Sequence, residues 1–249
     1  MRPSIAGNWK MNGLSSQLCE IEEMTRAVTA APASADILLC LPATLITRAV
    51  EMAAGCLLIG GETCHSEISG PFTGDISAEM LKDAGACAVI VGHSERRQHH
   101  GETDTVIAAK AAAARRAGLL AIICIGETKS QRQDGHALHV WARQLAGSVP
   151  VGMSSSEVAI AYEPLWAIGT GTIPSTEQIM EVHAHIRQRL AAQLGTDGRS
   201  VRILYGGSVK PSNAREIPEL PEVGGALVGG ASLTAKDFEA IFRAVPLRG

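Results

Sequence analysis

Eight short runs of aliphatic or β-branched residues recur along the sequence, and they constrain the fold more than any other feature. The runs are Ser4–Ala6, Ile37–Leu41, Cys56–Ile59, Cys87–Val91, Leu119–Ile125, Val158–Tyr162, Val201–Tyr205 and Ala226–Val228. Each run is continuous rather than alternating, which is typical of strands that are covered on both faces. Such strands predict a parallel sheet, because parallel sheets are the ones routinely buried on both sides.

Helical patterns lie between these runs. One helical face carries Leu14, Leu18, Ile21, Met24 and Val28, and another, near the C-terminus, carries Phe238, Ile241, Phe242 and Val245. Their spacing of three and four residues is that of an amphipathic helix. Ser175 and Gln178 fit a capping box, which predicts a helix that begins there and runs through Leu190.

Alternation of strand and helix, repeated eight times in 249 residues, predicts an α/β fold. Right-handed crossovers can close such a parallel sheet into a (β/α)8 barrel. An open doubly wound sheet is the alternative that periodicity by itself leaves open. No linker rich in proline, glycine or serine divides the chain, so we expect residues 1–249 to form one domain.

Composition excludes several classes of partner. The net charge is −3, which gives no general field for nucleic acid or an anionic membrane, and an aromatic share of 3% disfavours platforms that stack bases. No signal peptide or membrane-spanning segment is recognisable, which predicts a cytoplasmic protein. The six cysteines form no CxxC pair, and we expect them to be reduced and mostly buried.

Glycine and polar functional groups follow most of the runs. They occur at Asn8–Lys10, Gly60–Glu62, Gly92–Glu95, Gly126–Glu127, Glu163–Pro164, Gly206–Ser208 and Gly229–Gly230. In a parallel barrel the C-terminal ends of all strands lie on one face, and that face carries the active site. We therefore expect these groups, which are far apart in sequence, to converge on one site.

Five strings among these strand ends resemble the triosephosphate isomerase family. They are Gly7–Asn12, Gly92–Arg97, Ala161–Gly171, Tyr205–Val209 and Leu227–Leu233, in the family's order and at its spacings. The resemblance runs from the first strand to the last helix. It implies a homodimeric TIM barrel, an isomerase of glycolysis and gluconeogenesis that interconverts dihydroxyacetone phosphate and D-glyceraldehyde 3-phosphate. It implies no cofactor and no metal ion.

The resemblance and the chemistry of the reaction together assign catalytic roles to Glu163, His93, Lys10, Asn8 and Glu95. The reaction moves a proton between adjacent carbons, and a desolvated carboxylate such as Glu163 is a suitable base. His93 precedes a helix start, whose positive end favours a neutral imidazole that donates to the substrate carbonyl. Lys10 would stabilise the developing oxyanion, Asn8 would orient Lys10 and the substrate, and Glu95 would hold Lys10.

The phosphate site is expected to consist of backbone amides. The sequence holds no P-loop and no complete dinucleotide fingerprint. The resemblance implies that the phosphate is bound by Asn8, Lys10, Gly169, Ser208, Gly229 and Gly230. Gly229 and Gly230 are also expected to begin a helix whose N-terminus favours an anion.

The segment after Glu163 resembles the family's lid. Its residues are Pro164, Leu165, Trp166, Ala167, Ile168, Gly169, Thr170, Gly171 and Thr172. Closing Trp166 and Ile168 over the site would exclude water from the reactive enediolate. The family usually has Lys-Thr-Ala after Gly171, whereas this sequence has Thr-Ile-Pro, so Pro174 stiffens the end of the lid.

Residues 61–75 resemble the loop through which the family's subunits contact one another. Thr73 matches the residue that reaches the neighbouring subunit's site, Glu62 stands where glutamine is usual, and Cys64 lies in the same loop. Cys64 and His65 are adjacent, but two neighbouring ligands do not make a metal site, and no metal is expected. The expected partners are the triose phosphate and a second copy of the chain, with no nucleic acid and no membrane.

Two other functions fit parts of the sequence. A related isomerase of a four-carbon ketose phosphate would keep the same catalytic residues, since one extra hydroxymethyl group is a question of pocket shape. A non-catalytic phosphate-binding barrel would be expected to lose Lys10, His93 or Glu163, and all three are present. The intact lid and phosphate strings favour the three-carbon substrate.

Overall fold

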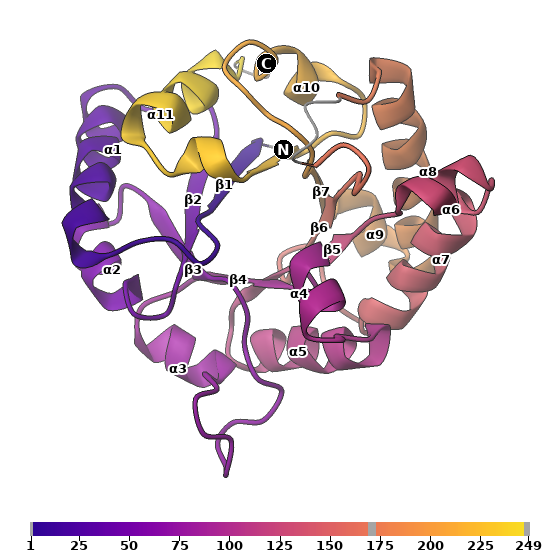
Figure 1. Ribbon diagram of the computed structural model, residues 1–249, viewed down its shortest axis with the longest axis horizontal. Helices are drawn as coiled ribbons and strands as arrows, with labels where there is room; N and C mark the ends of the chain where they lie inside the picture. The colour runs from indigo at the N-terminus through magenta and orange to yellow at the C-terminus, as the bar shows by residue number, and fades with distance from the viewer. Residues whose placement is uncertain (1, 169–172, 247–249) are drawn as a thin grey trace.

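A closed barrel of eight parallel strands, surrounded by helices, forms the centre of the computed structural model, which describes residues 2–168 and 173–246 (Figure 1). The barrel closes where β8 pairs with β1, with Gly225 opposite Ser4. The strands are β1 Ser4–Asn8, β2 Asp36–Leu41, β3 Leu58–Gly61, β4 Ala88–Val91, β5 Leu120–Ile125, β6 Val158–Tyr162, β7 Arg202–Tyr205 and β8 Gly225–Val228. The predicted single-domain (β/α)8 barrel is confirmed, and the open doubly wound sheet is excluded.

The strand bounds agree with the apolar runs to within two residues. The third run was expected over Cys56–Ile59, whereas β3 begins at Leu58 and extends through two glycines. A Cβ atom added to Gly60 would lie 2.9 Å from the carbonyl oxygen of Ala88. A Cβ atom added to Gly61 would lie 2.8 Å from a methyl group of Leu81. The strand therefore continues where a side chain would not fit, which an apolar pattern does not reveal.

Helices follow the strands around the barrel. They are α1 Leu18–Ala30, α2 Ile46–Ala53, α3 Ala78–Asp83, α4 Ser94–His99, α5 Asp104–Arg116, α6 Lys129–Gln133, α7 Ala137–Ser148, α8 Thr176–Leu194, α9 Thr196–Ser200, α10 Glu216–Glu219 and α11 Ala235–Ala244, with 3₁₀ turns η1 Ser15–Gln17 and η2 Gly230–Ser232. The capping box of α8 is confirmed, and the helix continues to Leu194. The expectation that Leu14 shares the buried face of α1 is wrong: η1 separates it from the helix, and it is 73% exposed.

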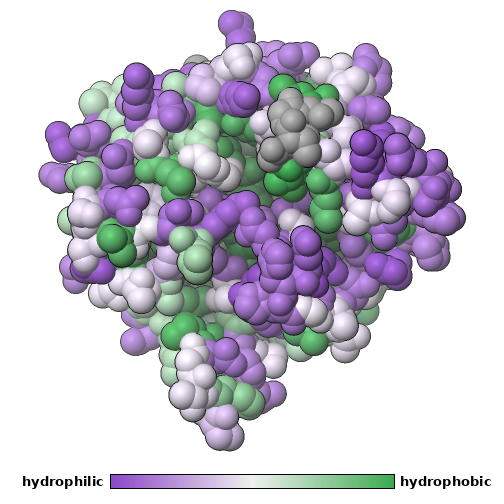
Figure 2. All heavy atoms as spheres, in the orientation of Figure 1, coloured by the Kyte–Doolittle hydropathy of each residue, from purple (hydrophilic) through white to green (hydrophobic). Residues whose placement is uncertain are grey.

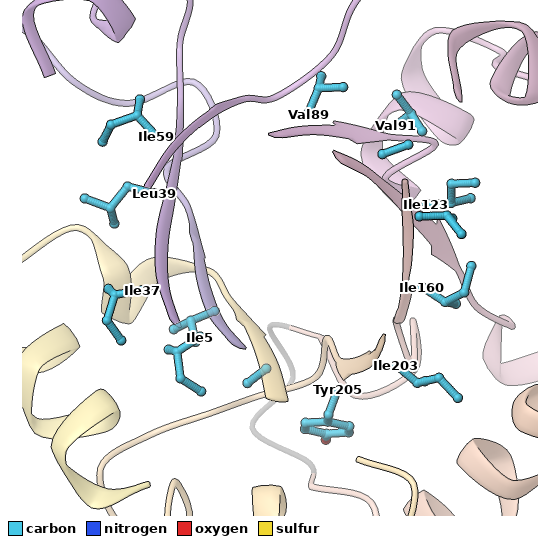
Figure 3. Packing of buried hydrophobic residues seen from close by; sticks show 14 of the residues in the cluster. Ile5, Ile37, Leu39, Ile59, Val89, Val91, Ile123, Ile160, Ile203 and Tyr205 are labelled. Carbon is cyan, nitrogen blue, oxygen red and sulfur yellow. The ribbon is translucent and has the colours of Figure 1, made fainter. Parts of the chain in front are cut away.

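The apolar side chains form two layers, because successive strand residues point to opposite faces. The layer within the barrel consists of Ala6, Leu38, Cys40, Ala88, Ile90, Ile122, Cys124, Ala159, Ala161, Leu204 and Leu227. The outer layer lies between the barrel and the helices, and Figure 3 shows residues such as Ile5, Leu39 and Ile160 pointing outward from the strands. The rigid double layer fixes the strand ends that carry the site.

The six cysteines are free thiols, as expected. Cys40, Cys64 and Cys124 are buried, but Cys19 and Cys56 are exposed, so the expectation of mostly buried thiols holds for only half of them. None of the described helices combines the length and apolar character needed to cross a membrane.

Candidate active site

Five of the C-terminal strand ends converge on one cavity, as the sequence predicted, but Gly60–Glu62 and Gly126–Glu127, which were expected there as well, do not line it. Its volume is about 300 Å³. The predicted residues that line it are Asn8, Lys10, His93, Glu163, Ile168, Ser208, Gly229 and Gly230. They come from the ends of β1, β4, β6, β7 and β8, so the barrel brings together groups more than two hundred residues apart in sequence.

Lys10 is held in an uncommon backbone conformation at the end of β1. Its φ angle is +56°, in the left-handed region that non-glycine residues rarely adopt. Its backbone N–H donates to Oδ1 of Asn8 at 3.1 Å, and its Nζ lies 2.6 Å from Oε1 of Glu95. These contacts hold the lysine at the cavity.

Glu95 itself lines the neighbouring cavity rather than the one beside Glu163. Partial burial opposes ionisation of its carboxyl group, but the hydrogen bond from Lys10 and the positive charge of Lys10 outweigh this effect and lower its pKa. Glu95 is therefore the ionised partner that keeps Lys10 in place.

His93 caps the N-terminus of α4, and its tautomer follows from its contacts. Its Nδ1 accepts a hydrogen bond from the backbone N–H of Glu95 at 3.3 Å, so the ring proton lies on Nε2. Nε2 lies 2.9 Å from Oε1 of Glu163, and the His93 side chain is 9% exposed. The Nε2–H is thereby aimed at Glu163, beside the cavity, as a hydrogen-bond donor.

Glu163 is almost completely buried at the end of β6, with its side chain 3% exposed. The backbone N–H of Ser94 donates to Oε2 at 2.9 Å, and the Ser94 hydroxyl donates to Oε1 at 3.1 Å. Together with His93, these donors stabilise the carboxylate where water hardly reaches it. Sequence analysis assigned no separate role to Ser94, although the residue lies inside the string Gly92–Arg97.

The strand ends β7 and β8 place three of the residues expected to bind the phosphate at the cavity. Ser208, Gly229 and Gly230 line the cavity beside Lys10, and an added Cβ on Gly230 would meet no atom within 4 Å. The helix expected from Gly229 is only the 3₁₀ turn η2, and α11 begins later, at Ala235. Gly169, the remaining predicted phosphate ligand, lies outside the described residues.

The described part of the lid, Pro164–Ile168, is anchored to the end of β5. The backbone N–H of Leu165 donates to the Glu127 carbonyl at 3.2 Å, and Nε1 of Trp166 donates to Oε1 of Glu127 at 2.8 Å. Of these five lid residues, Ile168 lines the cavity of about 300 Å³. The lid residues Gly169, Thr170, Gly171 and Thr172 lie outside the described residues.

Sequence analysis identified only part of the residues that support the site: it named Glu127 among the strand-end groups without a role, and it did not name Gln144. Glu127 is fully buried. The side-chain amide of Gln144, on α7, donates to the carbonyl oxygen of Gly126 at 3.1 Å and accepts from the backbone N–H of Gly126 at 2.8 Å. The position of Glu127, a charged residue close behind the apolar run of β5, was a signal that it lies near the site. No feature of the sequence pointed to Gln144, because it lies in an ordinary helical pattern.

The three predicted interface residues occupy different surroundings. Glu62 lines a second cavity, of about 860 Å³, together with Lys10, His93 and Glu95. Burial raises the pKa of Glu62 to about 8, and the charge of Glu95 adds to this rise, while a hydrogen bond from the Lys10 backbone and the Lys10 charge oppose it. Burial also raises the pKa of the Cys64 thiol, to about 11. Thr73 is exposed and lines neither cavity.

Metal binding finds no support in the part of the chain that the structure describes. There, no group of three or more His, Cys, Asp or Glu side chains could hold a metal ion.

The fold and this site define a class: an acid–base enzyme of the (β/α)8-barrel type that handles a small anionic substrate. The family model described as triosephosphate isomerase matches residues 3–245. The chain belongs to the triosephosphate isomerase family. It is thus an isomerase that interconverts triose phosphates, and the four-carbon and non-catalytic alternatives are not favoured.

Individual relatives agree with the family model. Triosephosphate isomerase of Rhodopseudomonas palustris is 54% identical over 249 residues, covering 99% of this chain and 98% of the relative. That of Hyphomonas neptunium is 56% identical over 243 residues, covering 97% and 98%. The crystal structure of triosephosphate isomerase from Bartonella henselae superimposes with a TM-score of 0.92 at 46% identity, covering 98% of this chain and 99% of that one.

Proposed function

We propose that Glu163 carries the proton between C1 and C2 of the triose phosphate. Its carboxylate takes a proton from C1 of dihydroxyacetone phosphate, which leaves an enediolate with negative charge on the C2 oxygen. The same carboxyl group then returns the proton to C2, while the proton of the C1 hydroxyl passes to the C2 oxygen, so that C1 becomes the aldehyde carbon and C2 carries a hydroxyl group. The observation that carries this role is the buried contact of 2.9 Å between Glu163 and the Nε2–H of His93.

His93 serves as the neutral donor to the substrate oxygens. Its Nε2–H now points to Glu163, so substrate binding must redirect this hydrogen bond to the carbonyl oxygen. Glu163 must likewise leave its contacts with Ser94 far enough to reach the substrate carbon. The described arrangement is therefore a resting arrangement, in which the two reacting groups stabilise each other.

Lys10 and Asn8 complete the catalytic group. The Lys10 ammonium lies beside the cavity and stabilises the enediolate oxygen and the phosphate by its charge, and Glu95 keeps the ammonium in place. Asn8 orients the Lys10 backbone and faces the same cavity.

The phosphate is bound by the amides of Ser208, Gly229 and Gly230, together with Gly169 of the lid. The open space at Gly230 supports this assignment, because the cavity is free there for a tetrahedral anion. Residues Pro164–Thr172 act as the lid that excludes water from the enediolate. One domain spanning residues 1–249 carries all these groups.

A second copy of the chain is the proposed partner. The segment between β3 and α3 projects beyond the ring of helices, and Figure 2 shows that it carries apolar residues among polar ones (Figures 1 and 2). Ile68, Phe72 and Ile76 in this segment are 56%, 39% and 37% exposed. The cavity of about 860 Å³ beside Lys10 is the matching recess, which exposed Met11 and Leu14 also line. In the homodimer, Thr73 would reach this recess in the partner, beside Glu62 and the loop of Cys64.

The reaction places the protein in glycolysis and gluconeogenesis, in the cytoplasm. No cofactor or metal takes part in the proposed steps. A coupled isomerase assay tests the substrate assignment by comparing D-glyceraldehyde 3-phosphate with its four-carbon analogues. The proposal predicts a kcat/KM that favours the three-carbon substrate, and a clear preference for a four-carbon substrate would contradict it.

A further inference from the structure

The first turn of the lid is held by a buried carboxylate that the proposed steps do not use. Glu127 follows β5 and is completely buried. It accepts hydrogen bonds from Nε1 of Trp141 at 2.7 Å, the hydroxyl of Tyr162 at 3.1 Å and Nε1 of Trp166 at 2.8 Å. Trp141 and Tyr162 belong to the rigid framework, whereas Trp166 belongs to the lid. Glu127 thus ties the lid to the barrel.

Arg132, on α6, contacts both Glu127 and Trp166. Its Nη1 lies 3.2 Å from Oε1 of Glu127, and within the described ranges it is the one cation that forms an ion pair with this carboxylate. The centre of its guanidinium group lies 5.0 Å from the centre of the Trp166 ring. A guanidinium over the face of a tryptophan is attracted by the ring. Arg132 therefore holds Trp166 directly and also through Glu127.

Apolar packing encloses this turn only in part, since Pro164 and Ala167 are buried whereas Leu165, Trp166 and Ile168 are half-buried. Leu165 and Trp166 border a cavity of about 890 Å³, which Thr128, Lys129 and Gln131 also line. The side chains of Leu165 and Trp166 are accordingly only partly buried. The polar contacts with Glu127 and Arg132 therefore act on the half-buried part of the turn, and on Trp166 in particular.

The position of this turn matters because Pro164 directly follows Glu163. In the described arrangement the Glu163 carboxylate is bound to Ser94 and His93, and it must leave these contacts to reach the substrate. A residue that holds the turn therefore also favours the resting position of Glu163.

We propose that Arg132 is a positioning residue that, through Trp166 and Glu127, favours the resting position of the lid's first turn over the substrate-bound position. The proposal rests on the proposed roles of Glu163 and the lid. Arg132 touches no substrate. It sets how readily the lid leaves its resting place.

The test compares three variants: Arg132→Met, Arg132→Lys and, as a matched control that removes one charge from the same helix, Lys129→Met. The probe is 2-phosphoglycolate, whose carboxylate imitates the enediolate, with its Kd measured by calorimetry alongside kcat and KM. Arg132→Met is expected to bind the probe about three- to tenfold more tightly, with kcat and KM both reduced. Arg132→Lys keeps the ion pair but stacks less well on the ring, so its Kd for the probe should lie between that of Arg132→Met and that of the parent protein. Lys129→Met should behave as the parent does.

A second measurement keeps the proposal falsifiable if Arg132→Met folds poorly. In a Trp166→Ala background, Arg132→Lys should no longer change the Kd of the probe, because its effect passes through Trp166. An unchanged or weaker affinity in the Arg132 variants, or an equal effect in both backgrounds, would overturn the proposal. A parent protein that neither isomerises triose phosphates nor binds the probe would instead overturn the proposed function.

Discussion

Single residues determine how the site is built, and Lys10 shows this most directly. Its left-handed backbone costs about 1–3 kcal/mol, which the hydrogen bond from its N–H to Asn8 and the ion pair with Glu95 offset. The strained turn aims the ammonium group back over the barrel mouth. Strain at this residue is consistent with a functional constraint rather than with a need of the fold.

Gly230 offers a test of the phosphate site at the same scale. Gly230→Ala should raise KM by about tenfold or more, because the added methyl group would occupy the space proposed for the phosphate. Its helical backbone accepts alanine, so the thermal midpoint should stay the same. Steady-state kinetics and inhibition by inorganic phosphate measure the effect. Unchanged values of both would mean that the phosphate binds elsewhere.

The sequence predicted the reacting residues better than the residues that support them. Asn8, Lys10, His93 and Glu163 could be placed together because each follows an apolar run, and a parallel barrel gathers the strand ends. The supporting role of Gln144 depends on a contact between α7 and the end of β5. A local pattern contains no information on such a contact.

Among the elements, the strands were predictable and the short turns were not. Continuous apolar runs mark buried parallel strands, whereas η1 and η2 are single 3₁₀ turns with no periodic signal. This explains why Leu14 was wrongly placed on a helix, and why the helix expected at Gly229 is only one turn. Gly126 shows a further limit: an added Cβ there would clash with the Glu163 carbonyl oxygen, which only the assembled barrel reveals.

The capping box of α8 gives a prediction for an element. Ser175→Ala removes the hydroxyl that accepts from the Gln178 N–H at 3.3 Å, where α8 begins after the lid. We expect a loss of about 1 kcal/mol, and a thermal midpoint lower by about 2–4 °C. Differential scanning calorimetry measures this change, and Ser175→Asp, which restores an acceptor, serves as the control. Equal midpoints for alanine and the parent would show that the cap contributes nothing.

For the molecule as a whole, the net charge of −3 provides no general attraction for an anion, so any positive field at the cavity is local. Lys10 lines the cavity, and the amides proposed to bind the phosphate would add to its field. The same face carries the recess proposed for a second copy, where Glu62 lies beside Lys10 and Glu95. The catalytic site and the proposed interface are therefore neighbours, and the charge of Glu62 bears on both.

The dependence of the free energy of unfolding on pH should reveal the ionisation of Glu62. Its pKa is about 8 in the folded chain, compared with 4.5 for an ordinary glutamate, so the folded chain binds more protons between these values. The free energy of unfolding should therefore fall as pH rises from about 4.5 to 8, and this loss should be complete above pH 8. Below pH 4.5 Glu62 is protonated in both the folded and the unfolded chain, so its carboxyl group no longer lowers the free energy of unfolding.

Glu62→Gln removes this cost, because the amide cannot ionise. We expect the variant to melt about 5 °C or more above the parent at pH 8.5, with a difference that shrinks as the pH falls toward 4.5. Thermal melts across this range, together with sedimentation equilibrium, separate stability from subunit association. A difference that does not depend on pH would refute the assignment of a neutral, buried carboxyl group.

The central claim, that Glu163 carries the proton, is tested most directly by the turnover of Glu163→Gln. The amide keeps the size of the side chain and cannot accept the proton, so kcat should fall by at least about a thousandfold. Circular dichroism, the thermal midpoint and inhibition by inorganic phosphate should show that the fold and the phosphate site persist. Near-normal turnover in a folded Glu163→Gln protein would contradict the claim.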